Sequence, residues 1–331
     1  MAFLEWLLFR QLLVAAAATM MLFATMGCPG PDPSERASTS VGGGSSSGSG
    51  EMTSSGSSAT TGSGGGAAPA CDASVPFGGA VEVSELNERM GYGDEMARLT
   101  QDEHTVYFSS FRTGDWNLFS AERRGRAGVF TNIRELTELD SAETDGAPTV
   151  TQGDTALYFH SDRTPPHSKI YLATRGDVTD DYSLVGPALD GGGSVQFHPY
   201  ILPNGSGIYW SAGDGALDGF DIYRADASGG GFLGPSKLVV NSLWADILPV
   251  LTPDDRTLFF ASNRPGGEGG YDIYVSVRFD ASDPFGAPTP VSELNTEDND
   301  TPSWVSTDGC RLYFTSSSDG VSRIYRTERQ R

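Results

Sequence analysis

Short runs of apolar and aromatic residues, separated by turn-forming residues, recur along the chain from residue 77 onward. In the clearest unit, residues 251–278, the aromatic run 258–261 follows a Pro-Asp-Asp turn, and the run 272–275 follows a glycine-rich loop. Aromatic and β-branched residues favour strands, whereas proline, aspartate and glycine favour turns. The unit therefore predicts three short strands, and a sheet of this size cannot bury its apolar faces alone.

The unit occurs five times. Its second strand recurs at residues 106–108, 157–159, 208–210, 258–260 and 312–314, and its third strand at 117–119, 169–171, 221–223, 272–274 and 323–325. The aromatic residue of the second strand repeats in steps of 51, 51, 50 and 54 residues. A period of this size that contains only strand signals predicts an all-β fold, a β-propeller with one blade per repeat.

A fourth strand precedes each inner strand, and its first copy is out of place. Residues 77–87 parallel residues 285–295, which follow the fourth repeat, but no blade precedes residue 77. The last blade, which ends near Tyr325, has no fourth strand after it. Pairing residues 77–83 with the last blade closes the ring and removes the open sheet edges. We therefore predict five four-stranded blades closed by the N-terminal strand.

Residues 251–278 resemble the WD40-like propeller repeat of the TolB family. The shared features are the Pro-Asp turn, the run Leu-Phe-Phe-Ala-Ser-Asn-Arg at 258–264, the glycine loop and Asp-Ile-Tyr at 272–274. The first and last copies carry Asn117 and Arg323 where the family prefers aspartate. The resemblance covers about residues 75–329 and implies a propeller. The resemblance also implies contact with envelope proteins or lipoproteins. Domains of the TolB type usually have six blades. The repeat occurs in scaffolds, peptidases and lyases alike, so the resemblance specifies the fold more than the function.

The N-terminal segment predicts export. Residues 1–27 contain one apolar run, too short for a comfortable membrane span, that ends at Gly27-Cys28 and resembles a bacterial lipoprotein signal. A plain signal peptide and an uncleaved anchor are the alternatives. Residues 28–70 are rich in glycine and serine and predict a flexible, disordered tether. We therefore divide the chain into a signal (1–27), a tether (28–70) and the propeller (71–331), with lipid attached to Cys28.

The charge of the chain limits its partners. The net charge is −21, which disfavours nucleic acids and anionic lipid surfaces. We expect neutral or basic partners, no nucleic acid, membrane contact through the lipid anchor alone, and a monomer.

Two repeated columns of polar residues are candidates for chemistry. The first opens the inner strand of each blade and consists of Asp94, Asp145, Gln196, Asp246 and Asp300. These residues predict a ring at one mouth of the channel, where they either cap the preceding turns or bind a cation such as calcium or a basic ligand. The second column consists of Arg112, Arg163, Asp214, Arg264 and Ser318. Its arginines predict blade-to-blade salt bridges, or alternatively docking of a partner.

The histidines and cysteines carry weaker signals. The four histidines lie at different strand positions, so nothing in the sequence makes them converge, and we expect them to be structural or exposed. If Cys28 carries lipid, two cysteines remain in an oxidising compartment. Closure of the ring brings Cys71 to the end of the last blade where Cys310 stands. We therefore predict a Cys71–Cys310 disulfide, the alternative being two unpaired thiols.

These features favour a non-enzymatic protein-binding or scaffold module on the bacterial cell envelope, without a cofactor. The alternative is a carbohydrate-active enzyme, a glycoside hydrolase or polysaccharide lyase, that uses channel-mouth carboxylates. A deep, tryptophan-lined pocket at the end of the channel would favour the enzyme, and a flat acidic mouth would favour the scaffold.

The lipid anchor is tested by Cys28→Ala. Because only a cysteine can accept the lipid, we expect the variant to stay unprocessed or to leave the membrane fraction. Fractionation followed by mass spectrometry of the N-terminus measures both outcomes. A variant that is processed and membrane-bound like the wild type would contradict lipidation.

Overall fold

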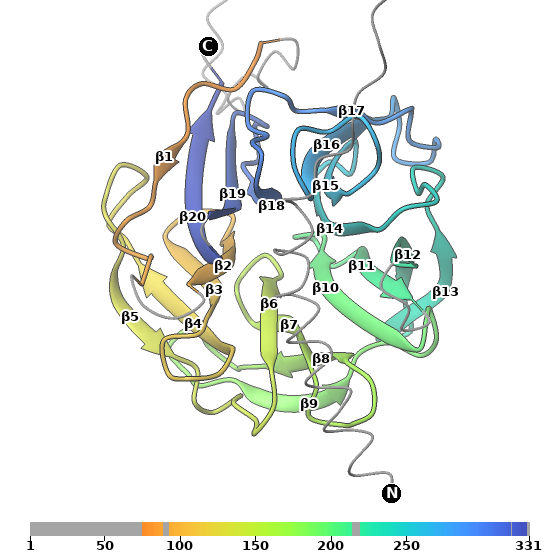
Figure 1. The fold of residues 1–331 in the computed structure, drawn as a ribbon. Coiled ribbons are helices and arrows are strands. Elements are labelled where there is room, and N and C mark those ends of the chain that lie inside the picture. Colours follow the sequence, from red (N-terminus) through yellow and green to blue (C-terminus); the bar gives the residue numbers. More distant parts are fainter. Residues whose placement is uncertain (1–74, 89–92, 214–218, 319, 330–331) are drawn as a thin grey trace, which may run out of the picture. The chain divides into compact units, whose positions relative to one another are not determined.

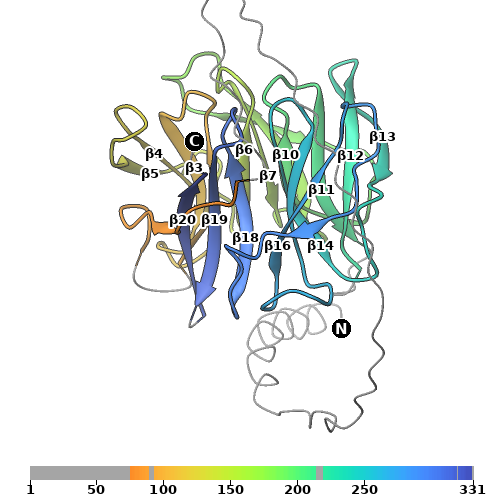
Figure 2. The same ribbon diagram turned by 90° about the horizontal axis from the view of Figure 1, so that it is seen from above.

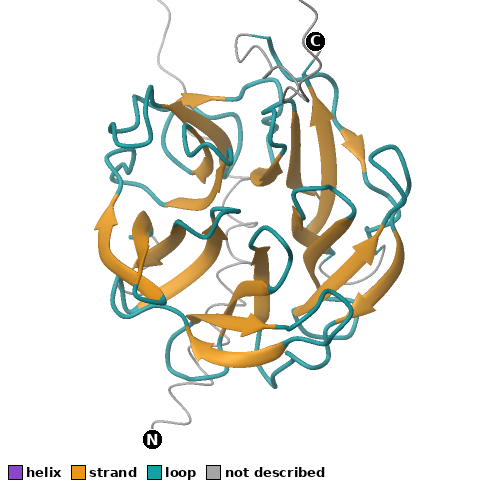
Figure 3. Ribbon diagram, turned by 180° about the vertical axis from the view of Figure 1, so that it is seen from behind, coloured by secondary structure: helices purple, strands orange, loops and turns teal. Residues whose placement is uncertain are grey.

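The structure, a computed structural model, describes residues 75–88, 93–213, 219–318 and 320–329. Its strands form five four-stranded sheets in a ring around a central axis, so the predicted five-bladed β-propeller is confirmed (Figure 1). The described residues contain strands and loops but no helix (Figure 3), and therefore none that could span a membrane. Seen from the side, the strands of each blade run antiparallel along the channel axis (Figure 2).

The blades are given from the innermost strand outward. The first is β2 (Asp94–Leu99), β3 (Thr105–Ser110), β4 (Asn117–Glu122) and β5 (Thr131–Glu135). The second is β6 (Asp145–Val150), β7 (Ala156–Ser161), β8 (Lys169–Thr174) and β9 (Ser183–Pro187). The third is β10 (Val195–Ile201), β11 (Gly207–Gly213), β12 (Asp221–Ser228) and β13 (Gly231–Lys237). The fourth is β14 (Asp246–Leu251), β15 (Thr257–Ser262), β16 (Asp272–Val277) and β17 (Thr289–Pro290).

The fifth blade confirms the predicted closure. It consists of β18 (Asn299–Val305), β19 (Arg311–Ser318), β20 (Val321–Glu328) and, as its outermost strand, β1 (Val81–Glu82). Strand β1 pairs antiparallel with β20, placing Val81 opposite Arg326, and an additional bridge joins Phe77 to Arg329. The N-terminal strand therefore covers an edge that would otherwise be open.

Each inner strand contains a β-bulge, and in three blades the preceding blade holds it. The bulge residues Met96, Ala147, His198 and Leu248 all have a positive φ, between 50° and 56°. The backbone N–H of three of them donates to a hydroxyl of the preceding blade: Met96 to Thr315 at 3.1 Å, Ala147 to Ser109 at 2.9 Å, and Leu248 to Ser211 at 3.0 Å. In the fifth blade the bulge residue is Pro302, which has no N–H to donate. The fourth blade correspondingly has Ala261 where other blades have the accepting hydroxyl, so the missing donor needs no acceptor.

A second link between blades lies at the turn between the first two strands. A tyrosine of one blade donates to a carboxylate in the next, Tyr107 to Asp154 at 2.9 Å and Tyr209 to Asp255 at 2.7 Å. An arginine from the same blade as the carboxylate completes each group, with Arg175 2.5 Å from Asp154 and Arg278 2.7 Å from Asp255.

The same link also joins the last blade to the first. Arg311 pairs with Glu103 at 2.5 Å, and Arg123 donates to the Tyr313 hydroxyl at 3.0 Å. The junction between the fourth and fifth blades carries neither partner of this link. Phe259 stands at the tyrosine position of the fourth blade, and Gly309 stands at the carboxylate position in the turn of the fifth.

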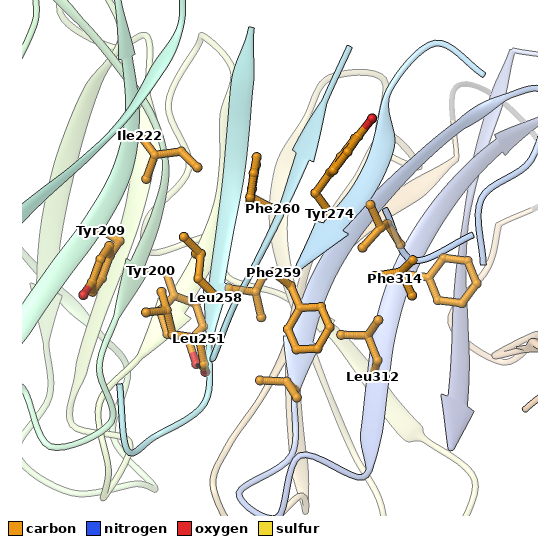
Figure 4. Packing of buried hydrophobic residues seen from close by; sticks show 14 of the residues in the cluster. Tyr200, Tyr209, Ile222, Leu251, Leu258, Phe259, Phe260, Tyr274, Leu312 and Phe314 are labelled. Carbon is orange, nitrogen blue, oxygen red and sulfur yellow. Dashed lines mark hydrogen bonds between the residues drawn. The ribbon is translucent and has the colours of Figure 1, made fainter. Parts of the chain in front are cut away.

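Apolar side chains fill the space between blades. The largest cluster joins the third, fourth and fifth blades, and Figure 4 shows Ile222, Phe259 and Phe314 within it. These three side chains are at most 2% exposed. Such packing fixes the blades relative to one another, and with them the inner strands that line the channel.

Cys310 is buried and takes part in a disulfide. Its predicted partner, Cys71, lies outside the described residues, as does Cys28. The N-terminal segment lies near Cys310, because Arg329 contacts both. Its backbone N–H donates to the Cys310 carbonyl at 2.8 Å, and its side chain donates to the carbonyl of Val75, four residues after Cys71. The Cys71–Cys310 pairing stays a prediction.

The blade link is tested by Tyr209→Phe. The variant removes one donor to the buried Asp255, and we expect the free energy of unfolding to fall by about 1–2 kcal/mol. Phe259→Tyr is the matched control, because its new hydroxyl would meet Gly309 in place of a carboxylate, and we expect no gain in stability. Urea unfolding measures both. A stabilised Phe259→Tyr, or an unchanged Tyr209→Phe, would contradict the assigned role.

Candidate functional site

The predicted acidic residues open the inner strands but do not line the channel together. Asp94, Asp145, Asp246 and Asp300 are completely buried, and Gln196 is 1% exposed. One carboxylate oxygen of each aspartate accepts hydrogen bonds from the turn before its strand. In the second blade, for example, Ser141 donates from its N–H and its hydroxyl to Asp145, each at 2.8 Å. The turn-capping interpretation is therefore confirmed.

The other oxygen of three aspartates binds the arginine column. Arg112 lies 2.6 Å from Asp94, Arg163 2.7 Å from Asp145, and Arg264 2.5 Å from Asp246. Each pair lies within one blade, because the arginine follows the strand adjacent to its aspartate, so the prediction of blade-to-blade salt bridges is wrong. Each guanidinium also lies over two aromatic rings of its blade and binds a backbone carbonyl of the preceding loop.

The remaining blades lack this pair. Ser318 stands in place of the arginine in the fifth blade, and burial raises the pKa of Asp300. In the third blade Gln196 donates to the Gly191 carbonyl at 2.6 Å, and Asp214 lies outside the described residues. No three acidic, histidine or cysteine side chains of the described residues converge on a possible metal position. The five predicted residues therefore provide no shared ligand set for calcium or a basic ligand.

The pocket in the channel is lined instead by the residue that follows four of the five predicted positions. Glu95, Gly146, Phe197 and Ile247 follow Asp94, Asp145, Gln196 and Asp246, and all four line one pocket. Successive side chains of a strand point to opposite faces. A shift of one residue therefore separates the buried capping column from the channel lining.

This channel-mouth pocket has a volume of about 290 Å³ and lies where the inner strands begin. Its polar members are Glu95, Ser109, Thr144, His160 and His198. Its apolar and aromatic members are Met96, Trp116, Phe197, Phe220, Ile247 and Tyr271, and Gly146 completes the wall.

Two histidines converge in the pocket, which the sequence did not predict. The rings of His160 and His198 lie 5.7 Å apart, and Phe197 lies 5.1 Å from His160. A side chain at Gly146 would approach the His160 ring to 2.9 Å, so glycine leaves the space that the ring needs. Burial lowers the pKa of His160 to about 4 and that of His198 well below its usual value, so both are neutral at pH 7. By contrast, His104 and His167 are exposed, as expected.

Glu95 is the one carboxylate among the described residues that line the pocket. Its hydrogen-bond partner is the Ser322 hydroxyl, at 3.4 Å. Burial raises the pKa of Glu95 to about 7, the Ser322 hydrogen bond lowers it, and the charge of Asp94 raises it further. The carboxyl can therefore exist in either protonation state near neutral pH.

Deeper in the channel lies a buried cation. Arg98 is 1% exposed, sits 4.8 Å over the Tyr200 ring, and reaches the Pro249 carbonyl at 3.5 Å. Its Nε and Nη2 have no hydrogen-bond partner, and burial lowers the pKa of Arg98 to about 10. Arg98 follows the pocket residue Glu95 by three positions along β2, farther from the end at which the strand begins, and its charge contributes to the depressed pKa of His198.

Comparison with known proteins gives matches by structure alone. No family model matches the chain. No curated protein matches its sequence.

Solved structures are similar in fold. A thermostable family-43 glycoside hydrolase aligns over 74% of this chain and 92% of its own, with a TM-score of 0.52 and 16% identity. An α-L-arabinofuranosidase from Lactobacillus brevis aligns over 75% and 94%, with a TM-score of 0.51 and 11% identity. TolB from Acinetobacter baumannii aligns over 72% of this chain and only 55% of its own length, with a TM-score of 0.44 and 16% identity. At such identities the likeness extends to the fold alone.

The burial of Glu95 predicts a pH-dependent stability. The pKa of Glu95 is about 7 in the folded protein, against 4.5 for an unperturbed glutamate. The folded state therefore prefers the protonated carboxyl, so the stability that Glu95 contributes is complete below pH 4.5 and is lost as the pH rises through 7. We expect Glu95→Gln to match the wild type at pH 4 and to be more stable by at most about 3 kcal/mol at pH 8.

Urea unfolding between pH 4 and pH 8 measures this difference. The control is Glu122→Gln, at the exposed far end of β4. Because Glu122 is exposed and lines no part of the pocket, this variant controls for the loss of one negative charge. A constant difference for Glu95→Gln would contradict the raised pKa.

Proposed function

We propose that this chain is an exported, lipid-anchored binding module of a bacterial cell envelope that engages a partner protein through the channel-mouth face. The proposal includes lipid attachment at Cys28 and the absence of enzymatic activity. The observation that carries it is an exposed apolar pair, Leu243 and Trp244, at the same end of the propeller as the pocket.

Leu243 and Trp244 lie in the turn before β14. Leu243 is 94% exposed and Trp244 is 48% exposed. The turn is held in place, because Ser242 donates from its hydroxyl to Asp246 at 2.9 Å, and the next residue, Ile247, lines the pocket. Adjacent large apolar side chains exposed to water are typical of protein-binding sites, because a partner removes them from water. Tryptophan is enriched among the interface residues that contribute most to the binding free energy.

The composition of the pocket supports binding over hydrolysis. Glycoside hydrolysis needs two carboxyl groups, about 5–9.5 Å apart, across the scissile bond. The described lining contributes only Glu95, and the nearest acidic residue in sequence, Asp94, points to the opposite face, where Arg112 binds it.

Two observations favour the alternative, a carbohydrate-active enzyme. The pocket is aromatic and includes Trp116, and the raised pKa of Glu95 suits a general acid near neutral pH. Hydrolysis of aryl glycosides or cleavage of polysaccharides by the wild type, lost in Glu95→Gln, would establish this function in place of ours.

Photo-crosslinking tests which face binds. We place a photoreactive phenylalanine analogue at Leu243 in one variant and at Phe279 in the other, in the full-length protein in its own membrane. Phe279 is a matched control because it is 89% exposed but follows the end of β16, whereas Tyr271, just before β16, lines the pocket. We expect one discrete protein adduct at position 243, identified by mass spectrometry, and none at 279.

Adducts of equal yield at both positions, or at 279 alone, would contradict the proposed face. Absence of any discrete adduct at 243, when the analogue is incorporated and the protein is folded, would contradict a protein partner. Fractionation of the same cells tests the envelope location independently.

A further inference from the structure

The carboxylate of Glu95 has no cation beside it. Among the residues that the structure describes, no lysine, arginine or histidine nitrogen lies within 4 Å of it, and its one hydrogen bond, from Ser322, is long at 3.4 Å. In contrast, the aspartate before it is paired at 2.6 Å. Glu95 is partly buried. A carboxylate partly withdrawn from water without a counter-charge is unfavourable, and a cationic ligand in the pocket would reduce this penalty.

The walls around Glu95 suit an organic cation. Trp116, Phe197, Phe220 and Tyr271 line the pocket, and the Phe197 and Phe220 rings lie 5.8 Å apart at an angle of 58°. Aromatic faces attract alkyl-ammonium groups through their quadrupoles, and the attraction is stronger where the contact is desolvated. A bare metal ion would instead require several oxygen ligands, which the described lining does not offer.

A second polar group in the pocket is unsatisfied. His160 is 6% exposed, and its Nδ1 has no hydrogen-bond partner. A neutral imidazole accepts a hydrogen bond at one ring nitrogen and donates from the other, so the His160 ring adds a polar group without charge to the wall. Buried polar atoms normally have partners, and the ring that carries this one lines the pocket.

Other ligand classes fit less well. An anion would meet the Glu95 carboxylate and two neutral imidazoles. A sugar needs several polar partners, but most of the residues that line the pocket are apolar or aromatic. The volume of about 290 Å³ is at the small end for ligand pockets and suits a group the size of one side chain. The net charge of −21 also attracts cations to the molecule.

We propose that the channel-mouth pocket binds an alkyl-ammonium group, with its charge against Glu95 and its alkyl part against the aromatic walls. This inference rests on the proposed binding function and specifies what the pocket recognises. Because Arg98 lies deeper in the channel, the cationic end stays on the outer side, at Glu95. The group is either the lysine side chain of a partner or a free small amine.

Calorimetric titration of the lipidated protein in detergent tests the proposal with two pairs of probes. The first pair is Nα-acetyl-lysine amide and its neutral norleucine analogue. The second is choline and its neutral carbon isostere. We expect at least one ammonium probe to bind about tenfold or more tightly than its neutral counterpart, and Glu95→Gln to abolish that preference. Glu122→Gln, which removes an exposed carboxylate at the far end of the blade, should preserve it.

The outcomes separate the possible sources and the two proposals. A preference for the lysine probe indicates a partner's side chain, and a preference for choline alone indicates a free amine. Equal binding of charged and neutral probes, no binding of either ammonium probe, or a preference that survives Glu95→Gln would overturn the ammonium site. The adduct at position 243 does not require this site, so its presence would keep the binding function even if the ammonium site fails.

Discussion

The antiparallel pairing of β1 with β20 is the contact on which the rest of the molecule depends. It closes the ring and so fixes the first blade against the fifth. The pocket carboxylate sits at this junction. Glu95 accepts its hydrogen bond from Ser322 of β20, and the next residue, Met96, donates to Thr315 of β19. A ring that opened here would break the hydrogen bond to Glu95 and would expose the edge of a sheet.

The repeated and the varied positions of the blades have separate roles. The aspartate–arginine pair recurs in three blades with nearly the same geometry, and it binds the turn before the inner strand to the rest of its blade. The adjacent channel column varies instead from glutamate to glycine, phenylalanine and isoleucine. A repeated position must satisfy the same local bonds in each blade, whereas an asymmetric ligand needs different groups around it. The site therefore lies where the repeat is broken.

The histidines illustrate this break. His160 stands where Ser109 and Ser211 hold the bulge N–H of the following blade, and His198 is itself a bulge residue. Replacing the hydroxyl by a ring brings an imidazole into the channel, and glycine at position 146 makes room for it. The substitution thus exchanges a link between blades for a polar group that faces a cavity.

The sequence by itself determined the fold, because strand periodicity, turn residues and the displaced first strand are local signals that repeat five times. It also located the strand ends at which the site lies. The site itself was decided by the tertiary structure. The one-residue shift from Asp94 to Glu95 depends on which face of the inner strand meets the channel, and the bulge at Met96 modifies that register. The meeting of His160 with His198 depends on how two blades pack, and residues 38 positions apart carry no signal of such a contact in one sequence.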